Sequence, residues 1–449
     1  MTQELRVAVV GAGPAGMYVA DALTYQKQLP ARVDVFDRMP TPFGLLRYGV
    51  APDHLKMKSL ARSLQRTLND ERVRFFGNVN VGSDVTVDEL RSAYHAVVYS
   101  FGASSDRQLD IPGEDLAGST SATDFVSWYS GHPDVPEDRY QLEGVSSAVV
   151  VGVGNVAVDV SRVLVKSVDE LRQTDIPEPV LARLAHSGVT DVHVLGRRGP
   201  VHARFTSKEL KELGELDGVD VLMDPAQLEL SSEDQEELAA EPAQQRNLDI
   251  MAEWAERGAT GAPRRLHLHF WSRPVEVLGA EGRMTAVRIE PTRLQDGRVV
   301  ADAPRYDLPA QLMLRSVGYR GVELPGVPLH DDTYTVPHVD GRVHRNEEVS
   351  VGEYVAGWIG RGPVGVLGTN RSDAESVVDR LLEDVPVLLQ QELSGSVEAL
   401  LAERGVNCVD CDGWLAIDAA EVARGSALGR PRTKIATWDQ LLAAAEISR

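Results

Sequence analysis

The stretch LRVAVVGAGPAGMYVADAL, residues Leu5–Leu23, decides the fold, because an apolar run passes directly into the glycine motif GAGPAG and then into a segment with helical apolar spacing. A second apolar run, VDVFD, follows at Val33–Asp37. This order predicts a strand over Arg6–Val10, a glycine turn, a helix through Leu23 and a second strand. The N-terminal part of the chain is therefore predicted to be a βαβ unit.

The glycine motif suits a nucleotide, because each glycine meets a different need. Gly11 permits the tight turn after the strand, Gly13 lets the backbone approach a pyrophosphate, and Gly16 allows close helix packing. The phosphates then meet the free N–H groups of a helix N-terminus. Asp37 ends the second strand, where a carboxylate accepts hydrogen bonds from ribose hydroxyls. Such a turn also occurs for packing alone, but its strand, helix and terminal acid together predict dinucleotide binding.

A second unit of the same kind begins with AVVV at Ala148–Val151 and continues with GVGNVAVD at Gly152–Asp159. A long helix and the strand VHVL at Val192–Leu195 follow, with an extra element expected near Pro177–Ser187. Ala157 holds the third small position of the glycine motif. This unit also has the order of a nucleotide-binding fold.

The second strand of this later unit ends in Gly196-Arg197-Arg198 instead of an acid. Two guanidiniums suit the dianionic 2′-phosphate of NADP, which a carboxylate would repel. The alternative is a solvated arginine pair at a strand end. The pattern favours NADP over NAD.

Two further segments resemble each other: HAVVYSFGASSDRQLDIPGED from His95 and AQLMLRSVGYRGVELPGVPL from Ala310. We interpret them as the two crossings between domains. The prediction is an α/β fold with two Rossmann-like dinucleotide-binding domains, in which an NADP domain (105–322) is inserted in a discontinuous FAD domain (1–104 and 323–449). One unit would hold FAD permanently and the other would exchange NADP(H).

Length and composition agree with several domains and exclude some functions. The chain has 449 residues, of which 43% are hydrophobic and 25% charged. We expect no membrane insertion, because no apolar run is long enough to span a bilayer. The strand expected at Arg6 leaves no room for a signal peptide, so a cytoplasmic location is predicted. The net charge of −21 opposes nucleic-acid binding.

The two cysteines, Cys408 and Cys411, exclude a disulfide framework and a four-cysteine metal site. We expect no metal site in this protein. A CxxC pair is sometimes an electron relay, but this one lies outside both nucleotide-type units, so a catalytic dithiol is not favoured.

Four long motifs, in order, resemble the adrenodoxin reductase family, whose bacterial members are ferredoxin–NADP⁺ reductases. They are FDRMPTPFGLLRYGVAPDH (Phe36–His54), VGVGNVAVDVSRVL (Val151–Leu164), LGRRGPVHARFTSKELKEL (Leu195–Leu213) and YVAGWIGRGPVGVLGTN (Tyr354–Asn370). The resemblance covers nearly the whole chain. It implies an FAD-containing enzyme that passes electrons from NADPH to a ferredoxin-type iron–sulfur protein.

The resemblance also implies roles for individual residues. The residues implied for FAD are Gly11, Ala12, Gly13, Pro14, Ala15, Gly16 and Asp37 at its ADP half, Leu45 and Leu46 along the flavin, and Trp358, Gly365, Val366 and Leu367 at its ring and pyrophosphate side. The residues implied for NADP(H) are Gly152, Val153, Gly154, Asn155, Val156, Arg197, Arg198 and Glu209, with Gly365 near the nicotinamide. Asp37 departs from the family's usual Glu, and Trp358 follows YVAG as in the adrenodoxin reductase branch.

The resemblance gives catalytic roles to His54 and Glu212, in proton handling and nicotinamide placement. The residues alone do not select them, because a histidine in a Pro-Asp-His turn is often structural and a charged helix often faces solvent. Hydride transfer requires no acid–base pair, so both are expected to tune the reaction. The basic run of Arg197, Arg198, Arg204, Lys208 and Lys211 is expected to meet NADPH phosphate and an acidic ferredoxin.

Two other functions stay open from the sequence. One is a flavin-dependent NADPH oxidoreductase acting on a quinone or another small molecule. The other is a sensor or assembly subunit that holds both nucleotides without turnover. Neither has a motif of its own in this chain.

Overall fold

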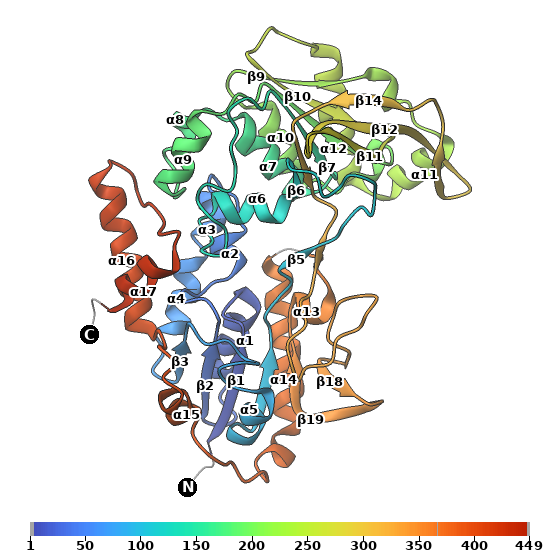
Figure 1. Ribbon diagram of the computed structural model, residues 1–449. Helices are drawn as coiled ribbons and strands as arrows, with labels where there is room; N and C mark the ends of the chain where they lie inside the picture. Colours follow the sequence, from blue (N-terminus) through green and yellow to red (C-terminus); the bar gives the residue numbers. More distant parts are fainter. Residues whose placement is uncertain (1–3, 366, 447–449) are drawn as a thin grey trace.

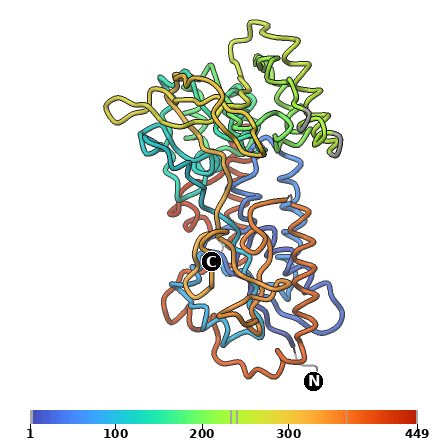
Figure 2. Tube along the Cα trace, turned by 90° about the vertical axis from the view of Figure 1, so that its right-hand side faces the viewer, coloured from blue at the N-terminus to red at the C-terminus, as the bar shows by residue number. Residues whose placement is uncertain are grey.

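The protein is described here by a computed structural model covering residues 4–365 and 367–446. Two lobes lie one above the other (Figure 1), and the view turned by 90° shows the same division (Figure 2). Each lobe is built around its own sheet, so the α/β class with two Rossmann-like units is confirmed. The predicted domain boundaries at 104/105 and 322/323 stay a prediction.

The lower lobe contains a seven-stranded sheet in the order β17-β18-β19-β4-β1-β2-β3. Its strands are β1 (Leu5–Val10), β2 (Ala31–Phe36), β3 (Val73–Phe76), β4 (Ala96–Tyr99), β17 (His338–Val339), β18 (Arg342–Arg345) and β19 (Glu348–Val355). The strands from β19 to β3 are parallel and mostly buried, which explains their continuous apolar sequences. This sheet carries the first glycine turn at the carboxyl end of β1.

Helices of the lower lobe cover both faces of its sheet or lie at its upper end (Figure 1). They are α1 (Pro14–Tyr25), α2 (Leu45–Tyr48), α3 (Leu55–Lys58), α4 (Ala61–Leu68), α5 (Val87–Ala93), α13 (Trp358–Arg361), α14 (Leu367–Leu388) and α15 (Val397–Glu403). Apolar residues of α1, α4 and α14 share one core with β1 and β2. The sequence therefore predicted the first βαβ unit with its elements in the right order.

The upper lobe contains a six-stranded parallel sheet in the order β6-β15-β7-β8-β10-β9. Its strands are β6 (Ser119–Ser121), β7 (Ser147–Val151), β8 (Asp191–Leu195), β9 (Val219–Met223), β10 (Arg264–His269) and β15 (Leu312–Arg315). Its helices are α6 (Ala122–Tyr129), α7 (Asn155–Val165), α8 (Val168–Leu171), α9 (Glu178–Ala185), α10 (Ser207–Gly214), α11 (Ser232–Ala240), α12 (Pro242–Arg257) and the 3₁₀ turns η1 (Pro200–His202) and η2 (Pro225–Leu228). The extra element expected near Pro177–Ser187 is α9.

An antiparallel sheet follows β10 in the chain and was not anticipated from the sequence. It consists of β11 (Ser272–Ala280), β12 (Arg283–Gln295), β13 (Arg298–Ala301) and β14 (Tyr306–Pro309). Val277, Val287 and Ile289 pack there with Leu195 and Met313 of the parallel sheet. The antiparallel sheet therefore covers one face of the six-stranded parallel sheet.

The chain passes between the lobes twice, along neighbouring paths. The outgoing strand β5 (Ser105–Asp106) pairs antiparallel with the returning strand β16 (Tyr319–Arg320). Figure 1 shows β5 between the two lobes. The interpretation of these two segments as crossings is confirmed.

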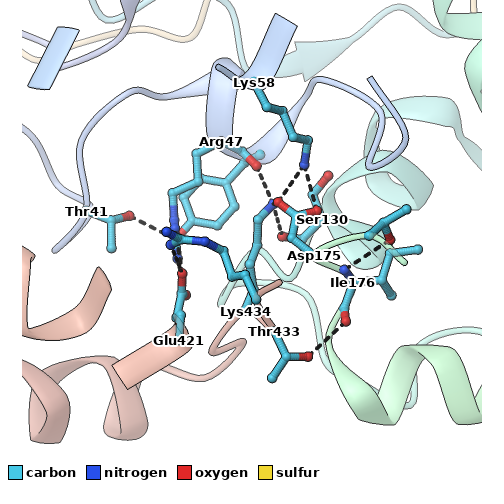
Figure 3. A network of polar contacts seen from close by, with 12 residues as sticks. Thr41, Arg47, Lys58, Ser130, Asp175, Ile176, Glu421, Thr433 and Lys434 are labelled. Atoms are coloured by element: carbon cyan, nitrogen blue, oxygen red, sulfur yellow. Dashed lines mark hydrogen bonds and ion pairs between the residues drawn. The ribbon is translucent and has the colours of Figure 1, made fainter. Parts of the chain in front are cut away.

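The C-terminal segment, residues 428–437 between α16 (Cys411–Ala427) and α17 (Trp438–Glu446), contacts both lobes. The Lys434 ammonium donates to the carbonyls of Arg47 and Ser130 and lies 3.4 Å from the Asp175 carboxylate (Figure 3). The Arg430 guanidinium donates to carbonyls of the loop before α9. This segment is a third connection between the lobes, and we call it the C-terminal strap.

Cys408 lies just before α16 and Cys411 begins it, and no disulfide joins the two. Burial raises the pKa of Cys411, and the neighbouring Asp412 and Asp410 carboxylates act in the same direction. Such a thiol is a poor nucleophile. Among the described helices, none is both long and apolar enough to cross a membrane.

Candidate functional site

The first glycine turn joins β1 to α1 and leaves one side open. Gly11 has φ +109°, and a Cβ there would lie 2.6 Å from the Ser100 carbonyl oxygen. A Cβ on Gly16 would lie 2.0 Å from the Gly11 carbonyl oxygen. A Cβ on Gly13, in contrast, would meet no atom within 4 Å. The turn is therefore packed at Gly11 and Gly16 and open at Gly13, directly before the N-terminus of α1.

Asp37 lies beside this turn at the end of β2. Its carboxylate accepts hydrogen bonds from the backbone N–H groups of Ala12 (2.8 Å) and Met39 (2.9 Å). Burial raises the pKa of Asp37, although these two backbone donors and Arg38 lower it. Asp37 thus holds the glycine turn against the end of β2.

The loop after β2 folds back over the same turn. The Phe43 N–H donates to the Ala12 carbonyl (2.8 Å), and a Cβ on Gly44 would lie 3.1 Å from the Gly13 Cα. Leu45 and Leu46 follow as the first residues of α2, the former half-buried and the latter buried. These two predicted flavin-lining residues therefore lie next to the predicted pyrophosphate turn.

The YVAGW segment reaches the turn from the far end of the sequence. A Cβ on Gly357 would lie 2.6 Å from the Ala15 Cβ, so Trp358 begins α13 beside the start of α1. The Trp358 Nε1 is buried with no hydrogen-bond partner among the described residues. Gly365 has φ +88° and Leu367 begins α14. Val366 lies outside the described residues.

The second glycine turn joins β7 to α7 and repeats the pattern. Gly152 has φ +131°, and a Cβ there would lie 2.1 Å from the Ser316 carbonyl oxygen. A Cβ on Gly154, the N-cap of α7, would meet no atom within 4 Å. The turn is held by the Arg204 N–H, which donates to the Val153 carbonyl (2.8 Å). It is open at Gly154, as the first turn is open at Gly13.

Three residues around Gly154 fix the start of α7. The Asn155 Oδ1 accepts the Thr206 N–H (2.9 Å), which ties the turn to the loop before α10. Val156 and Val153 are half-buried against the core of the upper lobe. Asn155 and the two valines therefore have structural contacts in addition to their predicted coenzyme contacts.

Arg197 and Arg198 lie beside the second turn, because β8 pairs with β7 and Val151 is opposite Leu195. Arg197 is exposed and Arg198 is half-buried. Within residues 4–365 and 367–446, neither guanidinium forms an ion pair, and the Arg198 Nε is buried without a hydrogen-bond partner. In a chain with 67 acidic residues, two unpaired guanidiniums at this position are available to an anionic ligand.

His54 lies where the two lobes meet, in a cluster of charged residues that we call the interdomain cluster. Its Nε2 lies 3.2 Å from the Glu209 carboxylate, 3.5 Å from that of Asp159 and 3.8 Å from that of Glu212. The predicted pair His54 and Glu212 is thus brought together from opposite lobes. Glu209, predicted to contact NADP(H), is 5% exposed and lies against His54.

Arg162 on α7 is the centre of this cluster. Its guanidinium donates to Asp53 (2.7 and 3.0 Å) and Asp159 (2.8 Å), and it contacts the His54 ring. Lys166, one turn further along α7, lies 2.8 Å from Asp53. Because Asp53 belongs to the lower lobe, these contacts hold α7 against the loop before α3.

Burial and neighbouring charges shift the protonation of the cluster. Burial lowers the pKa of His54, but the Glu209 and Asp159 carboxylates outweigh it, so the net pKa is above the ordinary value. Burial raises the pKa of Asp159 to about 6, although Arg162 and His54 lower it. Both shifts favour the protonated forms of His54 and Asp159.

Sequence reasoning did not identify Asp53, Asp159 or Arg162 as members of a site. The available signal was an Asp and an Arg three residues apart in the otherwise apolar helix VAVDVSRVL. Paired charges on the buried side of a helix need partners from another element. The identity of those partners depends on tertiary structure.

The two turns fit dinucleotides by their own geometry. Gly13 and Gly154 leave space at the carboxyl ends of parallel strands, where helix N-termini offer free N–H groups to phosphates. Asp37 follows β2, the strand beside the first turn. Arg197 and Arg198 follow β8, the strand beside the second turn. One turn has a carboxylate beside it and the other has two guanidiniums, so the two turns suit different nucleotides.

Comparisons with known proteins agree with this geometry. The family described as pyridine nucleotide-disulphide oxidoreductase matches residues 5–251. The NADPH-ferredoxin reductase FprA of Mycobacterium leprae is 43% identical over 450 residues, which cover 97% of each chain. The mitochondrial NADPH:adrenodoxin oxidoreductase of Bos taurus is 40% identical, covering 98% of this chain and 92% of that protein.

A solved structure of Mycobacterium tuberculosis FprA in complex with NADPH has the same overall architecture. Its TM-score against this chain is 0.92, at 42% sequence identity. The match covers 99% of this chain and all of that one. The likeness therefore extends over both lobes and the C-terminal strap.

Proposed function

The chain belongs to the adrenodoxin reductase family, among the pyridine nucleotide-disulphide oxidoreductases, and from this premise we propose that it is an FAD-dependent ferredoxin–NADP⁺ reductase. It takes electrons from NADPH and passes them through FAD to a ferredoxin-type iron–sulfur protein. One observation carries the proposal: two glycine turns are open to a ligand, and beside the second lie Arg197 and Arg198, neither of which forms an ion pair with a described residue.

The first turn is assigned to FAD and the second to NADPH. Gly13 and the N-terminus of α1 would hold the FAD pyrophosphate, with Asp37 at the ribose. The buried Trp358 Nε1 has no hydrogen-bond partner within the part of the chain that the structure describes, so it is a donor available beside that turn. Gly154 and the N-terminus of α7 would hold the NADPH pyrophosphate, with Arg197 and Arg198 at the 2′-phosphate.

When bound, FAD supplies a hydride acceptor that gives up its electrons one at a time. The chain's contribution is to fix the distance between the two nucleotide sites. The interdomain cluster does this by joining α7, which begins at the NADPH turn, to the loop that carries His54. His54 and Glu212 would then hold a proton and a charge close to the nicotinamide, tuning the reaction.

The proposal is tested by anaerobic reduction of the purified holoenzyme, followed by its flavin absorbance. NADPH should bleach the flavin rapidly and NADH much more slowly. The reduced enzyme should then reduce a ferredoxin faster than a quinone under matched conditions. Bleaching without ferredoxin reduction would make the enzyme a reductase of small molecules, and no bleaching at all would leave a nucleotide-binding protein without turnover.

The partner is proposed to be an acidic ferredoxin that docks on a local basic surface. In the predicted basic run, Lys208 and Lys211 lie near carboxylates of their own helix, Glu212 (3.3 Å) and Glu215 (3.7 Å). Arg204 is exposed without an ion pair among the described residues. The run alone therefore offers less free charge than its sequence suggests.

A second group of basic residues supplements that run from the lower lobe. Lys56, Arg62 and Arg66 on α3 and α4 are exposed, and none forms an ion pair within the described part of the chain. Leu55 and Leu60 beside them are 61% and 37% exposed. His54 connects this group to α10 through its contact with Glu212. Mixed apolar and basic character suits a transient acidic partner.

The docking surface is tested with the variant Lys56→Gln/Arg62→Gln/Arg66→Gln. It should raise the KM for ferredoxin and weaken its salt dependence, while flavin bleaching by NADPH keeps its rate. The matched control removes three exposed arginines of the upper lobe, Arg257, Arg283 and Arg298, and should leave that KM unchanged. Equal effects of the two triple variants would assign the result to net charge alone.

A further inference from the structure

Three histidines lie together on the upper lobe, on a part of the fold that the proposed function does not use. His193 is on β8, and His267 and His269 are on the neighbouring strand β10. In the parallel register His193 is directly opposite His267. Alternate residues of a strand point to the same face, so His269 shares that face with the other two. We call this group the histidine cluster.

The rings of the histidine cluster are close and nearly parallel. The His193 and His267 ring centroids are 4.4 Å apart, and those of His193 and His269 are 5.2 Å apart. The His193 Nδ1 and the His269 Nε2 are 3.0 Å apart. One nitrogen of each histidine lies within 4.8 Å of the corresponding atoms of the other two. Three imidazole nitrogens therefore converge on one small volume.

A ligand set needs neutral histidines. A hydrogen bond between two ring nitrogens has one protonated donor and one unprotonated acceptor, so His193 and His269 cannot both be imidazolium, and the donor ring takes its other tautomer when both nitrogens bind an ion. All three side chains are half-buried, which makes three adjacent positive charges costly. Neutral imidazole is the form that binds a metal ion.

Asp191 orients the His267 ring. Its carboxylate lies 2.9 Å from the His267 Nε2 and also accepts two hydrogen bonds from Arg265 (both 2.6 Å). This leaves the His267 Nδ1 for another contact. A carboxylate that holds one nitrogen of a histidine while the other binds metal is a recurrent feature of metal sites.

We propose that His193, His267 and His269 bind one divalent transition-metal ion, such as Zn²⁺ or Cu²⁺, with three imidazole nitrogens. Imidazole favours these borderline ions over Mg²⁺ or Ca²⁺, which prefer oxygen. Tetrahedral zinc with Zn–N bonds of about 2.0–2.1 Å places its ligand nitrogens ~3.3 Å apart. The distance between the His193 Nδ1 and the His269 Nε2 is close to that value, and His267 completes the set when its ring turns out of its stack with His193 and brings Nδ1 to the ion. Water would take the fourth position.

The other histidine-containing cluster does not compete for this assignment. His54, Asp159 and Glu209 also lie within ligand distance of one another. Their common space is occupied by the Arg162 guanidinium, which contacts all three. A cation already fills that site. No metal site was expected from the sequence. His193 joins His267 and His269 only when β8 pairs with β10.

The proposal is tested with tag-free holoenzyme freed of metal by a chelator. Titration calorimetry with Zn²⁺ should give one tight equivalent that Mg²⁺ does not displace. One equivalent of Cu²⁺ should give an electron paramagnetic resonance spectrum with hyperfine coupling to several imidazole nitrogens. This spectrum reports on the ligands directly and does not depend on enzyme activity.

Two variants locate the ion. His193→Asn/His269→Asn should weaken Zn²⁺ binding by more than tenfold and remove the imidazole coupling, and so should His269→Gln if the double variant folds poorly. The control His186→Asn changes an exposed histidine at the end of α9 and should bind as the unaltered protein does. Absence of a tight equivalent in the unaltered protein, or unchanged binding by the cluster variants, would overturn the proposal.

Discussion

Arg162 shows how one side chain determines the contact between the lobes. It is 2% exposed and binds carboxylates of both lobes, yet its NH1 has no hydrogen-bond partner among the described residues. A buried guanidinium needs compensating acceptors or opposite charges around it, and here Asp53, Asp159 and Glu209 provide them together. The placement of His54 follows from that requirement, because His54 is the residue after Asp53.

Arg197 and Arg198 carry the predicted preference for NADPH. Replacing both with glutamine should raise the KM for NADPH by about 10- to 100-fold, the usual effect of losing charged hydrogen bonds. The KM for NADH should change little, because NADH has no 2′-phosphate. Steady-state kinetics with both coenzymes measures this. Equal increases for NADH and NADPH would show that the pair does not recognise the 2′-phosphate.

Asp159 should make the stability of the holoenzyme depend on pH. Its pKa of about 6 in the folded protein is above that of an unfolded aspartate, so the folded state holds the proton more tightly. Its contribution to stability is complete below about pH 4 and is lost as the pH rises through about 6. In the Asp159→Asn variant residue 159 cannot ionise. Its Tm should therefore fall less between pH 4 and pH 7 than the Tm of the unaltered protein.

The measurement is the Tm of both proteins across that range. Asp115→Asn, a change at an exposed carboxylate, is the matched control and should follow the unaltered protein. The raised pKa of His54 acts in the same direction, since its contribution is also lost as the pH rises. Parallel Tm curves for Asp159→Asn and the unaltered protein would contradict the assigned titration.

At the scale of elements, the two glycine turns allow structural and ligand-binding effects to be separated. Gly152→Ala places a Cβ 2.1 Å from the Ser316 carbonyl oxygen at φ +131°, so the fold should lose stability. Gly154→Ala meets no protein atom within 4 Å, so the Tm should stay the same. Its methyl group would stand in the space assigned to the pyrophosphate, and the Kd for NADP⁺ should rise at least tenfold.

Thermal unfolding and NADP⁺ titration of both variants check this prediction. Unimpaired NADP⁺ binding by Gly154→Ala would mean that the pyrophosphate lies elsewhere. The first turn offers the corresponding pair of variants. Gly11→Ala should lower the stability of the fold, and Gly13→Ala should weaken the binding of FAD.

The sequence alone was sufficient to predict the elements whose pattern lies within one short stretch of the chain. The strands and turns at Leu5–Gly16 and Ser147–Gly154 were predicted because continuous apolar runs end in glycines. The antiparallel sheet of β11 to β14 was missed, because its strands face both solvent and core and alternate charged with apolar residues irregularly. The crossings were recognisable because each repeats the same order of strand, glycine and proline.

The site was predictable to a smaller extent. The glycines and the arginine pair follow from the chemistry of phosphate binding, which one stretch of chain can display. The interdomain cluster does not, because Glu209 looks like a solvated helix residue until His54 packs against it. Glu212 and His54 were selected by family resemblance alone.

At the scale of the whole molecule, the C-terminal strap should contribute to the stability of both lobes. The Arg430 side chain is 1% exposed and donates to the carbonyls of Arg172, Thr174 and Ile176. Arg430→Ala would leave the buried Thr174 carbonyl without its donor, at a cost of about 1–3 kcal/mol, and would remove one of the two donors to the Ile176 carbonyl, which keeps the Thr433 hydroxyl. We expect a clearly lower Tm and faster proteolysis of the loop before α9.

The control is Arg424→Ala on the exposed side of α16, where the guanidinium donates a hydrogen bond to the Gln440 side chain and forms no ion pair with a described residue. It should leave both measurements unchanged. If the two alanine variants behave alike, the strap does not stabilise the upper lobe.

The pairing of β5 with β16 has a practical consequence for protein engineering. Asp106 is opposite Tyr319 and Ser105 is opposite Arg320, so the upper lobe begins and ends at neighbouring points of the chain. A genetic cassette joined at these two positions can exchange this lobe for that of a relative without changing the span between its ends. A chimaera of this kind would transfer coenzyme selectivity as a module, provided that the acceptor carbonyls for Arg430 are retained.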